Sequence, residues 1–212
     1  MKVVEIFKSI DGEGITVGYP AVFVRLYGCN LRCKYCDTPY GYSGDNYKDI
    51  SIPEILQAVT FLKTKRVTVT GGEPLIHPNI NILLSCLCEK GFKVNVETNG
   101  TVEPSYYHPN IIYTMDYKLP CSGMSKKMNI KALNSLREQD VLKFVVGSKQ
   151  DMDEAVSVIK FLKSNPVIYF SPVFGSIEPK DIVEYILSRN INNVRVQLQL
   201  HKLIWEPERR GV

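Results

Sequence analysis

The sequence has no long apolar run, no internal repeat and no low-complexity segment. No stretch reaches the roughly 18 apolar residues that can span a bilayer, and the N-terminus lacks an apolar run followed by a small-residue cleavage site. We therefore expect a cytoplasmic protein that makes no use of a membrane. The net charge of +4 is mild, and no basic arm is present, so nucleic acid is not an expected partner.

The chain also lacks the export signal that would make disulfides probable, although it contains six cysteines. Clustered thiols in a reducing compartment indicate a metal rather than a set of disulfides. The length of 212 residues suffices for one well-buried core and is short for two. We predict a single domain over residues 1–212.

Short apolar runs alternate with amphipathic segments along most of the chain. The predicted strands are 21–26, 66–70, 93–97, 111–115, 141–146, 167–170 and 194–200, each apolar as expected for strands covered on both faces. The predicted helices are 52–63, 79–90, 128–138, 152–163 and 179–189. Between Glu97 and Ile111 the sequence contains turn residues and no helical pattern, which predicts a compressed crossover.

This alternation predicts an α/β fold with a mostly parallel sheet. Ligands then bind at the C-terminal ends of the strands, where the loops gather. Because the chain is short for eight strand–helix units, we predict a partial, open barrel.

The segment from Gly28 to Thr38 carries the strongest chemical signal. Cys29, Cys33 and Cys36 follow the first predicted strand with C-x3-C-x2-C spacing. Three thiolates this close together can bind three irons of one [4Fe–4S] cluster and leave the fourth iron open. An open coordination position is what catalysis at a metal requires.

Two other interpretations of these cysteines remain open at this point. They can be inert packing residues, or they can bind zinc together with one of the three histidines, His77, His108 or His201. No histidine stands at the spacing typical of zinc fingers. We assign no role to the remaining cysteines, Cys86, Cys88 and Cys121.

The cysteine segment resembles the signature of the radical S-adenosylmethionine superfamily, C-x3-C-x-aromatic-C, with Tyr35 at the aromatic position. Two further segments resemble its cofactor-facing loops and directly follow predicted strands. They are Thr70-Gly71-Gly72-Glu73-Pro74 and Glu97-Thr98-Asn99-Gly100. The resemblance implies a radical SAM barrel that binds a [4Fe–4S] cluster and S-adenosylmethionine.

Within the superfamily, nearly the whole chain resembles the 7-carboxy-7-deazaguanine synthase family. The similar segments are Ile10-Asp11-Gly12-Glu13-Gly14, Ala21 to Leu26, Cys36-Asp37-Thr38 and Gln199-Leu200-His201-Lys202. The chain departs from the family at Asp11, where Gln is expected, and at Asp116-Tyr117-Lys118, which replaces Ser-Pro-Lys.

The resemblance implies a lyase of queuosine and 7-deazapurine biosynthesis. Its reaction is the radical contraction of 6-carboxy-5,6,7,8-tetrahydropterin to 7-carboxy-7-deazaguanine with loss of ammonia. It further implies a flavodoxin or ferredoxin as electron donor, a Mg²⁺ ion on Thr38, and a homodimer. A glycyl-radical enzyme activase, which uses the same cysteine spacing, and a non-catalytic zinc module are the rival functions.

The resemblance also assigns residues to each ligand. The residues implied for S-adenosylmethionine are Tyr35, Cys36, Asp37, Gly71, Gly72, Glu73, Glu97, Asn99, Asp116, Tyr117, Lys118, Ser171, Pro172, Val173 and Phe174. Those implied for the pterin are Ile10, Asp11, Gly12, Glu13, Arg25, Thr70, His201 and Val212. For Arg25 a salt-bridged strand residue is the alternative, and for His201 a structural histidine.

Overall fold

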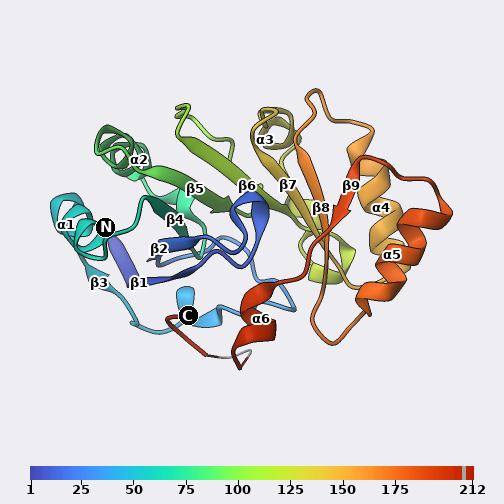
Figure 1. Cartoon of the computed structure of the whole chain (residues 1–212), viewed down its shortest axis with the longest axis horizontal. Helices are drawn as coiled ribbons and strands as arrows, with labels where there is room; N and C mark the ends of the chain where they lie inside the picture. Colours follow the sequence, from blue (N-terminus) through green and yellow to red (C-terminus); the bar gives the residue numbers. More distant parts are fainter. Residues whose placement is uncertain (207–208) are drawn as a thin grey trace.

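A computed structural model describes residues 1–206 and 209–212, and within them nine strands form one sheet. The strands are β1 (Lys2–Ile10), β2 (Pro20–Leu26), β3 (Lys48–Asp49), β4 (Arg66–Gly71), β5 (Lys93–Thr98), β6 (Ile111–Tyr117), β7 (Val141–Val146), β8 (Val167–Pro172) and β9 (Val194–Val196). Their order is β3-β1-β2-β4-β5-β6-β7-β8-β9 (Figure 1). From β2 onward neighbouring strands are parallel, whereas β1 is antiparallel to β2 and β3. The predicted α/β fold with a mostly parallel, open sheet is confirmed.

The helices stand largely where their patterns predict. They are α1 (Ile52–Phe61), α2 (Ile80–Glu89), α3 (Ile130–Asn134), α4 (Lys149–Ile159), α5 (Pro179–Ser188) and α6 (Leu200–Ile204), with short 3-10 turns η1 (Gly14–Thr16), η2 (Pro39–Gly41), η3 (Pro74–Ile76), η4 (Pro120–Ser122) and η5 (Ser125–Lys127). In Figure 1, α1 and α2 pack at one end of the sheet, and α4 and α5 at the other.

Local chemistry explains where α1 begins. The Ser51 hydroxyl accepts the Glu54 amide, while the Glu54 carboxylate accepts the Ser51 amide at 2.8 Å, which is a complete capping box. Pro53 occupies the first turn, where its missing N–H costs nothing. As predicted, no helix forms between β5 and β6 in the described chain. In residues 1–206 and 209–212, no helix combines the length and apolar character needed to cross a bilayer.

Two predicted elements are shorter in the structure. The predicted helix 128–138 is limited to α3, because Arg137 turns back to clamp the buried Asp140 carboxylate with its backbone and guanidinium. The predicted strand 194–200 ends at Val196, because the residues after it pair with the loop between β1 and β2. The sequence reading also missed β1, β3 and α6.

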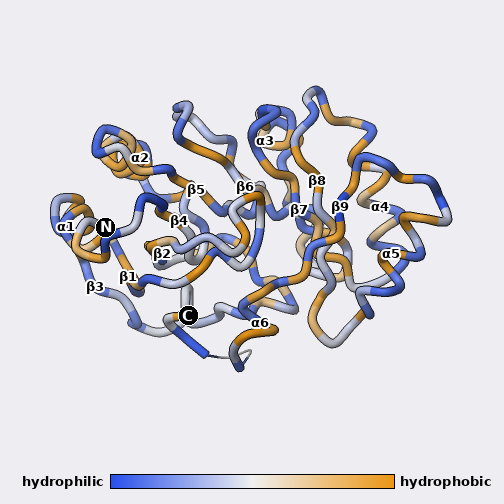
Figure 2. Tube along the Cα trace, viewed as in Figure 1, coloured by the Kyte–Doolittle hydropathy of each residue, from blue (hydrophilic) through white to orange (hydrophobic). Residues whose placement is uncertain are grey.

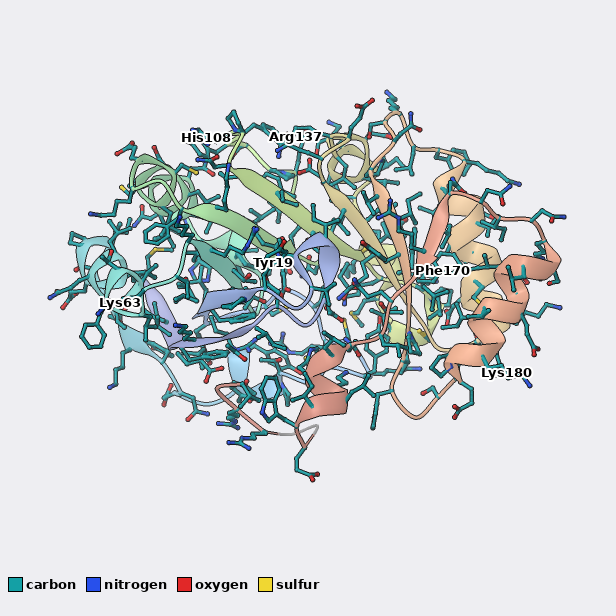
Figure 3. The ribbon with its side chains drawn as sticks, viewed as in Figure 1. Tyr19, Lys63, His108, Arg137, Phe170 and Lys180 are labelled. Carbon is teal, nitrogen blue, oxygen red and sulfur yellow. The ribbon has the colours of Figure 1, made fainter. Side chains whose placement is uncertain are left out.

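The two faces of the sheet differ in polarity. The outer face carries residues such as Val67, Val96 and Phe170, which pack with the apolar sides of the helices, orange in Figure 2. Phe170, labelled in Figure 3, lies edge-on to Phe144 with ring centroids 5.8 Å apart. The inner face carries buried polar side chains from five strands, namely Thr68, Thr70, Asn95, Thr114, Lys143 and Ser171. Buried apolar residues such as Val145 and Tyr169 share this inner face. The prediction of apolar strands therefore holds for the outer face and only in part for the inner one.

The loop between β1 and β2 is held by the chain that follows β9. The side-chain amide of Gln197 exchanges two hydrogen bonds with the backbone of Gly14, at 2.7 and 2.9 Å, and the amide of Leu200 donates to the carbonyl of Gly12 at 3.1 Å. A side chain at Gly12 would overlap the His201 ring, since its Cβ would lie 2.4 Å from Nδ1. Both ends of the sequence thus meet at the barrel.

Candidate active site

The three predicted cluster ligands lie on the loop that follows β2, at the C-terminal end of the parallel strands. Cys29, Cys33 and Cys36 are free thiols and partly buried. The sulfur of Cys29 accepts hydrogen bonds from the amide of Leu31 at 3.4 Å and from Asn99 Nδ2 at 3.7 Å. Burial raises the pKa of Cys33 to about 11. This thiol is therefore protonated at neutral pH, and a metal that binds it must displace the proton.

The Gly-Gly-Glu-Pro turn touches the cysteine loop through backbone. The amide of Gly72 donates to the carbonyl of Leu26 at 3.0 Å, and the amide of Glu73 donates to that of Gly28 at 2.7 Å. A Cβ on Gly72 would lie 1.9 Å from the Gly28 oxygen. Only glycine permits this approach.

Glu73 ties this turn to the loop after β5. Its carboxylate is fully buried and accepts hydrogen bonds from the Thr98 hydroxyl at 2.8 Å and from the amides of Leu75 and Asn99 at 2.9 and 2.6 Å. Burial raises the pKa of Glu73 to about 7. Because both oxygens are engaged by the chain itself, the structure places Glu73 as a brace between two loops. Its contact with S-adenosylmethionine stays a prediction.

Three buried polar atoms near the cysteine loop lack a protein partner. Asp116 Oδ1, Ser171 Oγ and the Tyr35 hydroxyl have none among residues 1–206 and 209–212. The other oxygen of Asp116 forms an ion pair with Lys118 at 3.0 Å. Buried polar atoms are normally hydrogen-bonded, so a bound polar molecule is the expected partner of these three.

Some predicted cofactor contacts lie apart from this group. The ring of Tyr117 packs edge-on against Phe144, 5.7 Å between centroids, on the outer face of the sheet. Pro172, the last residue of β8, and Val173, which follows it, are buried, whereas Phe174 is 58% exposed. The roles of these four residues stay predictions.

Asp37 links the cysteine loop to α6. Its carboxylate accepts the Thr38 hydroxyl at 3.1 Å and pairs with Lys202 at 3.0 Å. Although partial desolvation opposes it, the Lys202 ammonium lowers the pKa of Asp37, whose side chain is 45% exposed, to about 2. Thr38, the predicted magnesium ligand, therefore stands beside a carboxylate that is ionised at neutral pH.

Among the residues predicted to contact the pterin, Arg25 projects from β2 with its side chain 15% exposed. Its Nε donates to Glu5 Oε1 at 2.7 Å, and its guanidinium lies 5.8 Å from the centre of the Tyr40 ring. Arg25 is therefore salt-bridged, as the alternative predicts, but through only one of its three side-chain nitrogens. In the described part of the chain the two terminal nitrogens make no hydrogen bond, which leaves the fork open to a carboxylate ligand.

The charges of Glu13 and His201 act on each other, while Asp11 lies against Thr68 on the inner face of the sheet. Asp11 is buried against Thr68, whose hydroxyl donates to Oδ1 at 2.6 Å, and burial raises the pKa of Asp11. Ile10 ends β1, and Thr70 donates its hydroxyl to Glu97 at 2.7 Å. Near the half-buried C-terminal residue Val212, the guanidinium carbon of Arg210 lies 3.9 Å from the ring centroid of Tyr40, a residue of η2.

Three residues of this site were missed by the sequence reading: Glu5, Lys143 and Gln197. Lys143 is 6% exposed in the middle of β7. The available signal was a lysine inside the apolar run Val-Leu-Lys-Phe-Val-Val, since an unpaired ammonium is almost never buried.

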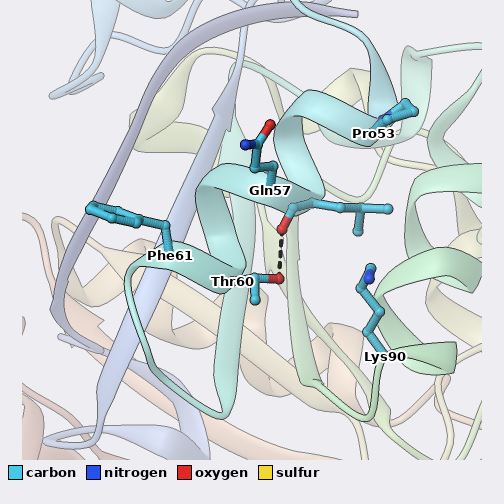
Figure 4. Close-up of a pocket in the computed structure, with 6 residues that line it drawn as sticks. Pro53, Gln57, Thr60, Phe61 and Lys90 are labelled. Carbon is cyan, nitrogen blue, oxygen red and sulfur yellow. Dashed lines mark hydrogen bonds between the residues drawn. The ribbon is translucent and has the colours of Figure 1, made fainter.

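A preformed single-ion site is not built by the described residues, in which no three His, Cys, Asp or Glu side chains converge on one point. A surface hollow of about 510 Å³ lies between α1 and α2, lined by Pro53, Leu56, Gln57, Thr60, Phe61 and Lys90 (Figure 4). None of the predicted site residues lines it.

The half-buried Glu97 carboxyl yields a pH prediction. Burial, with the nearby Glu13 charge, raises its pKa to about 7. Because the unfolded chain releases this proton at a lower pH, the wild type loses stability as pH rises from about 4.5 to 7. We expect Glu97→Gln to remove this loss, so that its unfolding free energy relative to wild type improves by roughly 1–3 kcal/mol between pH 5 and pH 8. Urea unfolding at both pH values measures this, and an equal difference at both would refute it.

Comparison with known proteins places the chain in a family. Residues 23–111 match the Radical SAM superfamily. The 7-carboxy-7-deazaguanine synthase of Clostridium acetobutylicum is 43% identical over 100% of this chain and 99% of its own length. The chain belongs to the 7-carboxy-7-deazaguanine synthase family. The enzyme of that name from Methanospirillum hungatei is 42% identical over 98% of this chain and 86% of its own length.

A solved structure agrees with this membership. QueE from Escherichia coli superposes with a TM-score of 0.77 at 25% identity and covers 93% of both chains. The partial radical SAM barrel predicted from the sequence is therefore confirmed. As a member of the 7-carboxy-7-deazaguanine synthase family the chain is a radical SAM enzyme. The activase and zinc-module alternatives are set aside.

The residues present fit the two groups that radical SAM chemistry requires. Three free thiols on one loop are the donor set of a [4Fe–4S] cluster with an open iron. Asn99 already donates a hydrogen bond to one of the sulfurs. The unpartnered atoms of Tyr35, Asp116 and Ser171 suit a polar ligand such as S-adenosylmethionine.

Proposed function

We propose that this 7-carboxy-7-deazaguanine synthase family member contracts the ring of 6-carboxy-5,6,7,8-tetrahydropterin to 7-carboxy-7-deazaguanine with loss of ammonia, as a step of queuosine or 7-deazapurine biosynthesis. The observation that carries the proposal is full-length similarity to enzymes of that name. It is supported by the cysteine loop that directly follows β2 and by the open guanidinium of Arg25 on β2 itself. We also propose that residues 1–212 act as one radical SAM core domain.

In this proposal Cys29, Cys33 and Cys36 hold the cluster, while Gly71, Gly72 and the unpartnered atoms of Asp116 and Ser171 receive S-adenosylmethionine. When bound, these groups supply the radical that removes hydrogen from the substrate. Asn99 orients the Cys29 sulfur, and the backbone contact between Gly72 and Gly28 fixes the distance between the two loops.

Arg25 binds the substrate carboxylate in this arrangement. Glu5 holds the guanidinium through Nε, and the rings of Phe7 and Tyr40 lie 5.9 and 5.8 Å from it. Since both terminal nitrogens stay available in the described structure, the fork can accept two carboxylate oxygens at once.

The remaining partners are part of the same proposal. Mg²⁺ binds Thr38 and completes its shell with water and substrate oxygens, as this ion readily does. The electron donor is a flavodoxin or ferredoxin, the assembly is a homodimer, and the enzyme works in the cytoplasm.

The proposal is tested on anaerobically reconstituted protein with S-adenosylmethionine, reductant, Mg²⁺ and 6-carboxytetrahydropterin, followed by mass spectrometry. We expect 7-carboxy-7-deazaguanine to form with many turnovers per S-adenosylmethionine. Production of 5′-deoxyadenosine with the pterin left intact would contradict the substrate assignment. Omission of Mg²⁺ tests the ion separately.

Replacement of Arg25 by lysine is expected to raise the KM for the pterin by about 10- to 100-fold, because a bidentate charged contact is worth roughly 1.5–3 kcal/mol. Steady-state kinetics against pterin concentration provide the measurement. Arg66→Lys is the matched control. Arg66 is the first residue of β4, at the end of the strand away from the cysteine loop, and it stacks on Tyr19. An unchanged KM in Arg25→Lys would remove Arg25 from the binding site.

A further inference from the structure

Lys143 is a buried cation that neither the family signature nor the proposed reaction accounts for. It stands in the middle of β7, between the fully buried Leu142 and Phe144, with only 6% of its surface exposed. Its side chain lies on the inner face of the sheet and points into the barrel, where it contacts two carboxylates.

These contacts form a line of alternating charge across the barrel interior. Lys143 Nζ lies 2.5 Å from Glu13 Oε2 and 3.3 Å from Asp116 Oδ2. Asp116 Oδ2 also pairs with Lys118 at 3.0 Å, and Gln199 Nε2 donates to the other oxygen of Glu13. The line joins Glu13, a predicted pterin contact, to Asp116, a predicted S-adenosylmethionine contact.

Stability alone is a poor explanation for such a line. Desolvation offsets much of the attraction within a buried ion pair, and an apolar replacement of the whole pair is often neutral or stabilising. Loss of one partner is costly, because the other charge is left buried and unpaired. A buried line of charge that ends on ligand-facing carboxylates therefore indicates a role in holding those carboxylates.

We propose that Lys143 is a positioning residue of the pterin site, which keeps the Glu13 carboxylate charged and fixed in the barrel and couples it to Asp116. The inference rests on the proposed function, because it takes Glu13 as a contact of the pterin. Lys143 itself acts through Glu13, and Gln199 fixes the second oxygen of that carboxylate.

The surroundings of Glu13 predict what happens without Lys143. The charged and titratable groups that face it are Lys143 from β7, His201 from α6, Asp116 from β6 and Glu97 from β5. Burial works against ionisation of Glu13, and the Lys143 ammonium, with help from His201, lowers the pKa of Glu13 in spite of it. Once the ammonium is removed, burial and the two other carboxylates raise that pKa toward neutrality.

The test compares wild type with Lys143→Met, Lys143→Arg, Glu13→Gln and the double variant Glu13→Gln/Lys143→Met, all reconstituted with cluster. KM and kcat for the pterin are measured from pH 6 to pH 9. Calorimetry measures the affinity for 7-carboxy-7-deazaguanine, which requires no turnover. Lys149→Met is the matched control, since Lys149 is exposed at the start of α4.

We expect Lys143→Met to raise KM at least tenfold at pH 7 with a smaller change in kcat. It should also add an ionisation to kcat/KM between pH 6 and pH 8, beside the one that the Glu97 carboxyl contributes in wild type. Lys143→Arg restores the wild-type profile, and the double variant binds no more weakly than Glu13→Gln alone. A purely structural lysine would lower the yield of folded protein without a new ionisation.

Two results would overturn the inference. Lys143→Met with the wild-type KM and the wild-type pH profile removes Lys143 from the site. Multiplicative effects of the two single substitutions show that Lys143 acts independently of Glu13. If Lys143→Met does not fold, Lys143→Gln carries the same comparison. A wild type that turns over the pterin while the Lys143 variants behave normally refutes this inference alone, whereas a wild type that neither binds nor converts it refutes the proposed function as well.

Discussion

Replacement of Cys33 by alanine is expected to abolish cluster binding and to lower product formation by at least roughly a thousandfold, because a cluster with three protein ligands cannot keep its open-iron geometry on two. Cys33 is partly buried beside Lys118, whose charge favours the thiolate against the effect of burial. Iron and sulfide content, together with the brown absorption of the reconstituted protein, provide a measurement that does not depend on turnover.

Cys86→Ala is the matched control for this substitution. Cys86 is a free, partly buried thiol on α2, outside the cysteine loop. The control should retain full iron content and activity. A Cys33→Ala protein with the iron content and activity of wild type would show that the cluster is held elsewhere.

The second large effect is expected at Gly72. An added methyl group would lie 1.9 Å from the Gly28 oxygen and 2.3 Å from its carbonyl carbon, so the two loops must separate. Separation breaks the hydrogen bonds from the amides of Gly72 and Glu73. We expect Gly72→Ala to lose about 2–4 kcal/mol of unfolding free energy and most of its capacity to load the cluster. Urea unfolding and iron content measure the two effects.

Gly91→Ala separates this clash from ordinary backbone strain. Gly91 has a φ of +81°, yet an added Cβ there meets nothing within 4 Å. Its cost is about 1 kcal/mol from the left-handed conformation, with no loss of cluster. Equal effects of the two substitutions would show that the close approach at Gly72 has no special importance.

Much of this fold follows from short-range pattern. Alternating strands and helices predict the parallel sheet, and the missing helix between Glu97 and Ile111 is readable from turn residues. The chemistry of the three cysteines and of the glycine pair can be predicted from the sequence, because each group lies in one short segment at the end of a strand. The sequence did not predict that the inner face of the sheet is polar. Single polar residues among valines, such as Thr68 and Asn95, occur in fully buried strands as well as in strands with one polar face.

The sequence by itself determined the α/β class, the mostly parallel sheet and the missing helix between β5 and β6. It also predicts the cluster ligands and a site at the C-terminal ends of the strands, because these follow from contiguous segments. Tertiary structure alone decided which polar groups, far apart in the sequence, pair with one another. Lys143 meets Glu13 across 130 residues, and Gln197 holds Gly14 across 183. Hydrophobic periodicity reports only which face of an element is buried, whereas the pairing of polar groups inside the barrel depends on how the sheet and its loops bring the two ends of the chain together.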